Sequence, residues 1–474
     1  MKQTYKTIDY EWLTRPTGDP FADAGGFAIE YLSEKFPEKD ILELIDYINK
    51  IYVHKWNANL YMFFHNSKIL QPAYKGDKKI FESNNYFKSL IQEKDSIGFG
   101  YCRITGREAS LFIGGRNNSM LTGAGTLVNY HHFFQKGIAL SKEALMRIHF
   151  VPFACPLLQG KIGLMQSSNE TLSRLFVRMT IDKNLHEIAT GISEGATKAV
   201  MNVPANEIFE FVDYSINHLA EFRNSNSLPS LTLYHFTNFK DQPNVKLYQL
   251  PSKVFLFYRT CLQPRFKEDW QRFVRSHYYD GQHKGAKYNL QSGTFELAKS
   301  KETEVIDFDD YKQWFNRILN KLLIGESIRP EVLRWSRKNP FNFEIVSIYQ
   351  QNIIGMKKET IIKIKELATF LVREEDADKI KKRIKALDGA KNASALRRFI
   401  LKDVVAANYM AMNENPIVTV DDYVNYLFPD GSYWAEIRDI LLIAIYQELH
   451  ERNLISEDLK VELDSEVEEE VIYD

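Results

Sequence analysis

The sequence predicts an α+β fold: a large mixed body over residues 1–355, an all-α antiparallel helical bundle over residues 356–455, and an acidic tail over residues 456–474. In the body, short aromatic and β-branched runs alternate irregularly with helical patterns, without the regular βαβ order of a parallel sheet. After Lys357 the prolines almost vanish and helical periodicity dominates. The chain has 474 residues and 44% of them are apolar, which suffices for two or three domains with buried cores.

The body is expected to begin with a helix at Asp19 and Pro20, because Asp suits an N-cap and Pro the first helical position. Apolar residues from Phe21 to Leu32 continue it at helical spacing, and a second helix is expected over Lys39–Tyr52. Further helices are predicted over Ala205–Phe222 and Asp309–Leu323. Strands are predicted in the apolar runs NLYMFF, ASLFIGG, RIHFVPF, SLTLYHF, VKLYQL and VFLFYRT.

The bundle is expected to contain helices near residues 358–373, 376–388, 393–412, 420–427 and 433–453. Thr419, with Asp422 three residues later, resembles a capping box at the start of one of them. Short connections such as DGAKN and FPDGS favour antiparallel neighbours.

Charge is segregated along the chain, although the formal net charge is only −1. Residues 357–402 hold 14 Lys and Arg against 7 Asp and Glu, and residues 253–287 hold 8 against 3. The tail has 9 acids and one base. Two basic blocks indicate local anionic partners rather than a generally basic protein.

The composition also indicates the compartment. The opening residues lack the pattern of a secretory signal, and no window approaches the roughly 18 apolar residues of a membrane span. The three cysteines, Cys102, Cys155 and Cys261, form no CxxC pair, so they are expected to be buried thiols. We therefore expect a cytoplasmic protein with no membrane partner.

Motifs of catalysis are absent from the sequence. His186-Glu187 begins a word like HExxH, but Thr190 replaces the second histidine that would bind zinc. No GxSxG motif and no complete phosphate-binding loop occurs. Asp309-Asp310 and Asp421-Asp422 stand at expected helix starts, where carboxylates are favoured by exposed N–H groups. The sequence predicts no catalytic residues, no metal and no cofactor.

A first candidate nucleic-acid site is the glycine-rich segment RITGREASLFIGGRNNSMLTGAGT. Its glycines allow the backbone to approach a phosphate, its arginines supply charge, and its amides suit base edges. A pair of hairpins with solvated tips is the alternative. The candidate residues are Arg103, Arg107, Gly114, Gly115, Arg116, Asn117, Asn118 and Ser119.

A second candidate is the basic segment after residue 258, where cations alternate with aromatic residues, as proteins that bind single strands require. Phe266, Trp270, Phe273 and Val274 have helical spacing, so most of these rings are expected in the core and the basic face of the helix is the candidate. Its residues are Arg259, Arg265, Lys267, Arg272, Arg275, Lys284 and Lys287.

The third candidate is a basic face of the bundle, which would hold a DNA strand without regard to sequence and in a salt-sensitive way. The alternative is an ordinary solvated helix face. Its residues are Lys379, Lys381, Lys382, Lys385, Lys391, Arg397 and Arg398.

The opening stretch TGDPFADAGGFAIEYL resembles the signature of large subunits of type I-B CRISPR interference complexes (Cascade). The layout, an α+β body followed by a helical domain of about 100 residues, is similar as well. The resemblance thus covers the whole chain by architecture and its first stretch by a specific motif.

The resemblance implies a non-catalytic subunit that binds the guide RNA and other Cascade subunits. Such a subunit recognises the motif flanking the target, binds double-stranded target DNA, stabilises the R-loop with its displaced strand, and helps recruit a helicase-nuclease. The bundle would resemble the separate small subunit, and Met356 lies where an internal start would produce a free copy of it. Several relatives carry paired CxxC motifs for zinc; this chain does not, so zinc is not carried over.

Two other classes remain open from the residues. One is a metal-dependent nuclease or other nucleic-acid-processing enzyme whose carboxylates converge only in the folded chain, with Asp19, Asp23 and Glu30 as its candidates. The other is a protein-interaction scaffold in which the basic blocks meet acidic partner surfaces.

Overall fold

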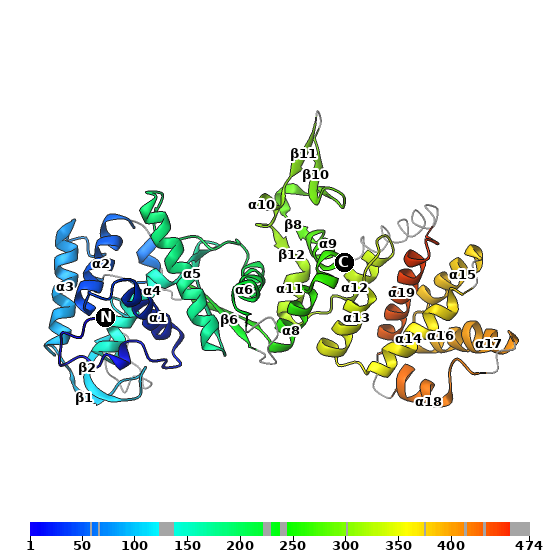
Figure 1. Ribbon diagram of the computed structural model, residues 1–474, viewed down its shortest axis with the longest axis horizontal. Coiled ribbons are helices and arrows are strands. Elements are labelled where there is room, and N and C mark those ends of the chain that lie inside the picture. The colour runs from blue at the N-terminus through cyan, green and yellow to red at the C-terminus, as the bar shows by residue number, and fades with distance from the viewer. Residues whose placement is uncertain are drawn as a thin grey trace. The chain divides into compact units, whose positions relative to one another are not determined.

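The computed structural model describes residues 1–56, 59–64, 67–122, 137–220, 229–237, 244–299, 302–373, 376–411, 415–429 and 433–455. The chain divides into two compact units, residues 1–252 and 253–474, which are coloured blue to green and green to red in Figure 1. The predicted boundary after residue 355 falls inside the second unit, so the predicted domain division stays a prediction. The acidic tail, residues 456–474, lies outside the described residues.

The first unit begins with helices whose starts the sequence specifies. The side chain of Asp19 accepts a hydrogen bond from the Ala22 N–H (2.8 Å) and caps α1 (Pro20–Lys35), as predicted. Asp40 and Glu43 form a capping box at α2 (Ile41–His54), which confirms the second predicted helix. The helix α1 packs against α4 (Lys142–Ala154) and α5 (Glu170–Ala189), while α2 packs against α3 (Asp77–Ile91).

Two antiparallel sheets complete the first unit. One has the order β1 (Gly98–Tyr101), β2 (Glu108–Gly114) and β3 (Ile138–Ser141). The other has the order β4 (Leu157–Leu158), β5 (Lys161–Ser167), β6 (Leu231–Thr237) and β7 (Asn244–Leu250). Helix α6 (Pro204–His218) contacts β6 and β7. Strands predicted in ASLFIGG, SLTLYHF and VKLYQL are thereby confirmed.

Three predicted strands are wrong. NLYMFF contributes to a short 3-10 helix, Asn59–Met62, RIHFVPF lies in α4, and VFLFYRT lies in α8 (Ser252–Cys261). In α4 nearly every residue is buried, Pro152 included, so the segment has no polar face that would reveal helical periodicity. The sequence pattern of a short apolar run that is buried on all sides fits a strand and a helix equally well.

The second unit opens with α8 and α9 (Pro264–Arg275), followed by short strands. Strands β9 (Lys287–Asn289), β10 (Thr294–Ala298) and β11 (Thr303–Ile306) form an antiparallel sheet, and Figure 1 shows the β10–β11 hairpin projecting from the helices. Strands β8 (Tyr278–Tyr279) and β12 (Phe315–Asn316) pair with each other. A cluster of Tyr278, Phe295, Ile306 and Tyr311 forms the local core.

The helix predicted over Asp309–Leu323 is divided in two. Helix α10 (Phe308–Tyr311) ends before β12, and α11 (Arg317–Ile324) starts after it. Asn316 causes the restart, because its Oδ1 accepts a hydrogen bond from the Leu319 N–H (3.0 Å) and caps the new helix. Between them, Trp314 packs on Phe295 with ring centroids 5.1 Å apart.

The remainder of the second unit is helical and surrounds α19 (Trp434–Glu451), which contacts α12 (Arg329–Ser336), α13 (Phe343–Tyr349), α14 (Lys358–Leu371), α15 (Ala377–Asp388) and α16 (Ala393–Phe399). The predicted helices exist, but two contain π-helical turns. Residues 400–406 join α16 to α17 (Ala407–Met410), and residues 423–427 extend α18 (Val420–Asp422). The capping box of Thr419 and Asp422 is confirmed. The observed architecture is α+β, as predicted.

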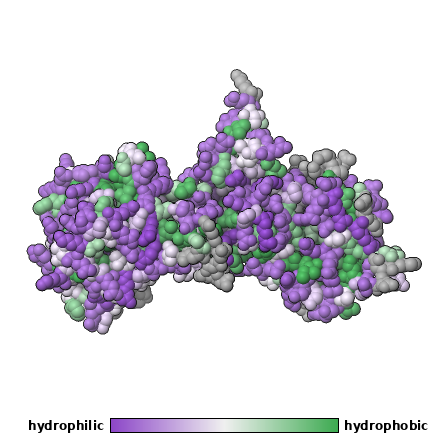
Figure 2. Space-filling model, in the orientation of Figure 1, coloured by the Kyte–Doolittle hydropathy of each residue, from purple (hydrophilic) through white to green (hydrophobic). Residues whose placement is uncertain are grey.

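The described surface is mostly hydrophilic, and Figure 2 shows apolar side chains only in small separate patches of this face. Throughout the residues that the structure describes, no helix combines the length and apolarity that crossing a bilayer requires.

Candidate nucleic-acid interface

The TGDPFADAGG motif is organised around the buried carboxylate of Asp23 in the first turn of α1. Its Oδ1 accepts hydrogen bonds from Arg147 Nη2 (2.7 Å) and from the Thr17 N–H and hydroxyl (2.7 and 2.8 Å), and its Oδ2 accepts one from the Gly18 N–H (2.9 Å). The motif therefore forms a closed loop tied to α4.

Arg147 is fully buried in α4 and its guanidinium is satisfied on every side. Besides Asp23, it donates to the backbone carbonyls of Ala22 (2.8 Å), Arg15 (2.7 Å) and Trp12 (3.2 Å). Burial lowers the pKa of Arg147, and the negative charge of Asp23 opposes that shift. A buried ion pair with this many hydrogen bonds fixes the geometry of the loop.

Gly25 and Gly26 allow α1 to approach α4 at this point. A Cβ atom at Gly25 would clash with the backbone carbonyl of Arg147, and one at Gly26 would lie 2.7 Å from Arg147 Nη2. The glycines thus serve close packing of two helices.

The carboxylates considered for a nuclease have structural partners. Asp19 caps α1, Asp23 pairs with Arg147, and Glu30 forms an ion pair with Arg174. Within the described ranges, no group of three His, Cys, Asp or Glu side chains is placed to hold a metal ion. The cysteines Cys102, Cys155 and Cys261 are buried and free, as predicted.

The described part of the glycine-rich segment, residues 103–122, forms the β1–β2 turn, β2 and the turn after it, and residues 123–126 lie outside the described residues. Gly114 is buried, and a Cβ atom there would lie 2.6 Å from the Leu140 side chain. Asn118 fixes the next turn: its Oδ1 accepts from the Gly115 N–H (2.8 Å), and its Nδ2 donates to Tyr86 Oη (2.8 Å) and to the Ile113 carbonyl (3.1 Å). Ser119 is buried there.

The other side chains of this segment differ in whether they already interact with residues of the chain. Arg107 forms an ion pair with Asp9 (2.8 Å) and lies over the Trp12 ring, 5.0 Å from its centroid. Arg103 and Arg116 also have interaction partners. Asn117 is exposed, and its amide has no hydrogen-bond partner among the described residues. The structure thus leaves Asn117 as an exposed amide of this loop that is not engaged by the described residues.

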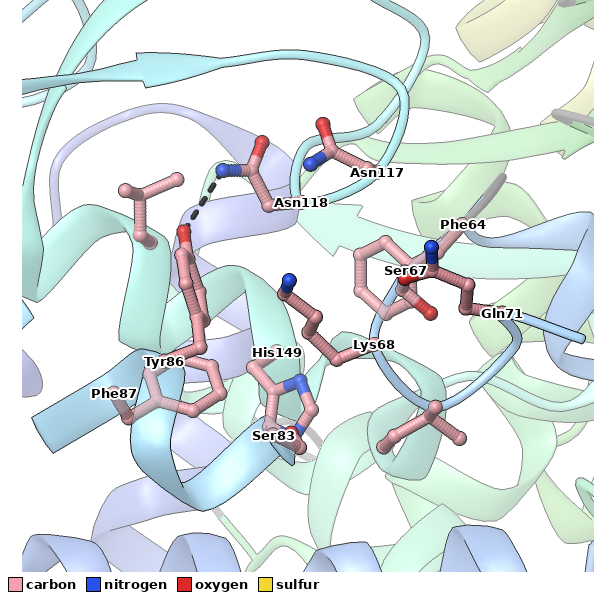
Figure 3. A pocket seen from close by; sticks show the side chains of 12 residues that line it. Phe64, Ser67, Lys68, Gln71, Ser83, Tyr86, Phe87, Asn117, Asn118 and His149 are labelled. Atoms are coloured by element: carbon pink, nitrogen blue, oxygen red, sulfur yellow. Dashed lines mark hydrogen bonds between the residues drawn. The ribbon is translucent and has the colours of Figure 1, made fainter. Parts of the chain in front are cut away.

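Beside Asn117 lies a cavity of about 220 Å³, which Figure 3 shows. Its aromatic wall consists of Phe64, Tyr86, Phe87 and His149, and its polar lining includes Ser67, Lys68, Gln71 and Ser83. Figure 3 shows Asn117 and Asn118 at one end of the view, His149 and Ser83 at the other, and Lys68 between them. Burial raises the pKa of Tyr86 to about 12, so its hydroxyl keeps its proton.

A chain of amides leads from the surface to His149. Asp46 accepts from Asn84 Nδ2 (2.7 Å), Asn84 Oδ1 accepts from Asn49 Nδ2 (2.8 Å), and Asn49 Oδ1 faces His149 Nε2 (2.8 Å). The carboxylate of Asp46 can only accept hydrogen bonds, so it fixes the orientation of the Asn84 amide, and Asn84 fixes that of Asn49. The Asn49 Oδ1 atom also can only accept, so the Nε2 atom of His149 carries the proton. Burial lowers the pKa of His149 to about 3, so the neutral ring has Nδ1 as an acceptor.

In the basic segment, the aromatic residues are core, as expected. Phe266, Trp270 and Phe273 are at most 1% exposed. On the outer face, Arg265 pairs with Glu344 (3.0 Å), Arg272 pairs with Glu268, and Arg275 lies over the Phe308 ring, 4.4 Å from its centroid. Arg259 is partly buried, which lowers its pKa, whereas Lys267, Lys284 and Lys287 are exposed. Acidic neighbours therefore neutralise part of the positive charge on this face.

In the bundle, the basic residues line one side of α15 and α16. Ile380, Ile384 and Leu387 of α15 are buried, which leaves Lys379, Lys382 and Lys385 exposed and Lys381 partly so. Lys391, Arg397 and Arg398 are also exposed, and Arg397 lies over the Phe428 ring (5.1 Å). Lys382, Lys391 and Arg398 have no acidic partner among the described residues. Lys379, by contrast, pairs with Asp376 (3.7 Å), so this face is partly neutralised as well.

Sequence reasoning missed Lys68, Gln71 and His149. They belong to separate segments that come together beside Asn117 only in the folded chain, and no local sequence pattern predicts them as a site. A His in an apolar run, such as His149 in RIHFVPF, is the one available signal, and it ordinarily indicates a core residue.

The fold defines a large α+β protein with a helical C-terminal region. Residues 334–473, 140 of the 474, match the family model described as DevT C-terminal domain. The match begins within α12 and contains α13 to α19. It is consistent with the large subunit of a Cascade-type complex. No curated protein matches the chain.

Proposed function

We propose that the chain is the non-catalytic large subunit of an RNA-guided CRISPR interference complex. The match of residues 334–473 to the DevT C-terminal domain carries the proposal, because it extends from α12 through α19 of the helical region. The TGDPFADAGG signature at the other end of the chain supports it independently.

In this role the subunit positions nucleic acids through charge and shape. The glycine- and arginine-bearing loop after β2 approaches the duplex motif that flanks the target, and the basic face of α15 and α16 supports a DNA strand of the R-loop. Base pairing with the guide RNA reads the rest of the target. The subunit works in the cytoplasm with the guide RNA and the other Cascade subunits, and it helps to recruit the helicase-nuclease.

The test is a gel-shift titration of target duplex with the guide-RNA complex assembled with and without this chain. Duplexes with the correct and with a scrambled flanking motif are compared. We expect binding that depends on the motif only when the chain is present. Equal binding without the chain would refute the recognition role, and metal-dependent cleavage by the isolated chain would favour a nuclease instead.

A further inference from the structure

The cavity beside Asn117 has the chemistry of a binding site for one flat heterocycle. Phe64, Phe87 and His149 supply ring surfaces; the Phe64 and His149 rings are stacked with centroids 6.3 Å apart, and those of Phe87 and His149 lie 4.7 Å apart. At about 220 Å³ the cavity falls below the roughly 300–1,000 Å³ of sites for drug-sized ligands, which suits a single ring system.

Polar groups around the cavity lack partners. Among the described residues, the side chains of Ser67, Gln71 and Asn117 make no hydrogen bond, and the Lys68 ammonium has no carboxylate partner. The Lys68 Nζ atom lies 6.0 Å from the centroid of the Tyr74 ring. Lys68 and Asn117 are exposed and Ser67 and Gln71 are half-buried, so water can satisfy all four in the free chain and a ligand can take its place.

His149, which lines the cavity, is held in one tautomer. The amide chain from Asp46 through Asn84 and Asn49 places the proton of His149 on Nε2, so Nδ1 is an acceptor. Asn118 is already saturated by Gly115, Ile113 and Tyr86, which holds the rim in place. A preorganised pocket loses less entropy on binding.

The available groups favour a nucleotide over a peptide side chain. An aromatic or aliphatic side chain would fill the apolar wall and leave the amides of Gln71 and Asn117 unpaired. A nucleobase stacks on rings and uses amides at its edge, and its phosphate suits Lys68. No carboxylate is among the described residues that line the cavity, so nothing there repels a phosphate.

We propose that this cavity binds a single unpaired nucleotide, with the base against Phe64, Phe87 and His149, its edge read by Gln71 and Asn117, and its phosphate on Lys68. The proposal rests on the proposed function and deepens it. The nucleotide comes either from the guide RNA or from an unpaired DNA strand, and the two sources share this chemistry.

The test measures fluorescence anisotropy of the purified full chain with labelled single strands of about eight nucleotides, within the usual site size. One RNA and one DNA of the same sequence are used, each also with an abasic residue moved through every position. We expect one position at which base removal weakens binding about tenfold, as loss of one stacked base does. If only the RNA shows a position at which base removal weakens binding, the nucleotide comes from the guide. If only the DNA shows one, the nucleotide comes from the target.

Variants complete the test. Lys68→Gln with Asn117→Ala is expected to weaken binding of the intact strand about tenfold and to reduce the abasic effect, because the nucleotide loses its phosphate contact and an edge contact and then occupies the pocket less often. Lys75→Gln, an exposed lysine outside the cavity, is the matched control and should bind as the unaltered chain does.

Uniform response at every abasic position, an abasic effect unchanged in the double variant, or no binding of either strand would overturn the proposal. The gel-shift assay separates this failure from failure of the proposed function. If the unaltered chain confers motif-dependent binding but no abasic position responds in the anisotropy assay, the pocket is wrong and the function stands. If the unaltered chain confers no motif dependence, the function itself is wrong.

Discussion

Arg147 Nη2 lies 2.7 Å from Asp23 Oδ1 within the core of the first unit, where Arg147 is fully buried. The pair joins α1 to α4 across 124 residues of sequence. It explains why the opening motif contains an acid followed by two glycines: the acid holds the guanidinium, and the glycines admit the helix that carries it.

Replacing Arg147 by Met should lower the free energy of unfolding by about 3–5 kcal/mol, because Asp23 would be left buried without its charged partner. Asp19→Ala, which removes only a helix cap, should cost about 1 kcal/mol. Urea titration followed by fluorescence and circular dichroism compares the two. Equal costs would show that the ion pair is not what stabilises the junction.

Gly25→Ala should destabilise the first unit by about 3 kcal/mol or more, because its methyl group would meet the Arg147 carbonyl on a rigid helix. Gly281→Ala is the control, since no atom lies within 4 Å of a Cβ there. Thermal unfolding should show a lower midpoint for the first variant and an unchanged one for the second. A normal midpoint for Gly25→Ala would mean that α1 and α4 separate readily.

Glu207 predicts a pH dependence of stability. It is buried, accepts a hydrogen bond from the Met201 N–H (2.8 Å), and burial raises its pKa to about 7. The folded state therefore holds the proton more tightly than the unfolded state. Its contribution to stability is complete below about pH 4.5 and is lost as the pH rises through 7.

Glu207→Gln should consequently stabilise the protein at pH 8, by at most about 3 kcal/mol, and change little at pH 4. The amide keeps an oxygen for the Met201 N–H and has no charge to bury. Urea titrations at both pH values measure the difference, with the exposed Glu194→Gln as control. Stabilisation of equal size at both pH values would contradict a titration at Glu207.

The basic bundle face predicts a change in salt dependence. In the assembled complex, Lys382→Gln and Arg398→Gln should each reduce the slope of log affinity for DNA against log salt by about one, if each cation neutralises one phosphate. Lys358→Gln, on an exposed part of α14 outside this face, is the control. An unchanged slope in both variants, with normal folding, would place the DNA elsewhere.

Local signals predicted much of the fold correctly. The caps at Asp19 and Thr419 and the periodicity of the bundle depend on residues within about four positions of each other, which the sequence displays directly. Other predictions failed. VFLFYRT forms a helix and the Asp309–Leu323 helix is broken by β12 because packing partners distant in sequence override local preference.

The candidate site was predicted only in part. Asn117 belongs to a loop that the sequence singled out, and the exposed bundle cations follow from helical spacing. The sequence could not show that Arg107 pairs with Asp9, that Asn118 is saturated, or that Lys68 and His149 lie beside Asn117. These relationships depend on where distant segments meet.

By itself, the sequence determined the α+β class, the helix starts, the basic blocks and the signature at residues 17–26, since composition and short-range spacing suffice for each. Only the tertiary structure decided which charged side chains pair within the chain and which amides at a cavity remain free to bind a ligand. The physical reason is that a cap or a periodic face is satisfied within one turn of chain. A buried charge or a pocket is completed by residues far apart in the sequence, as Asp23 and Arg147 or Phe64 and His149 are.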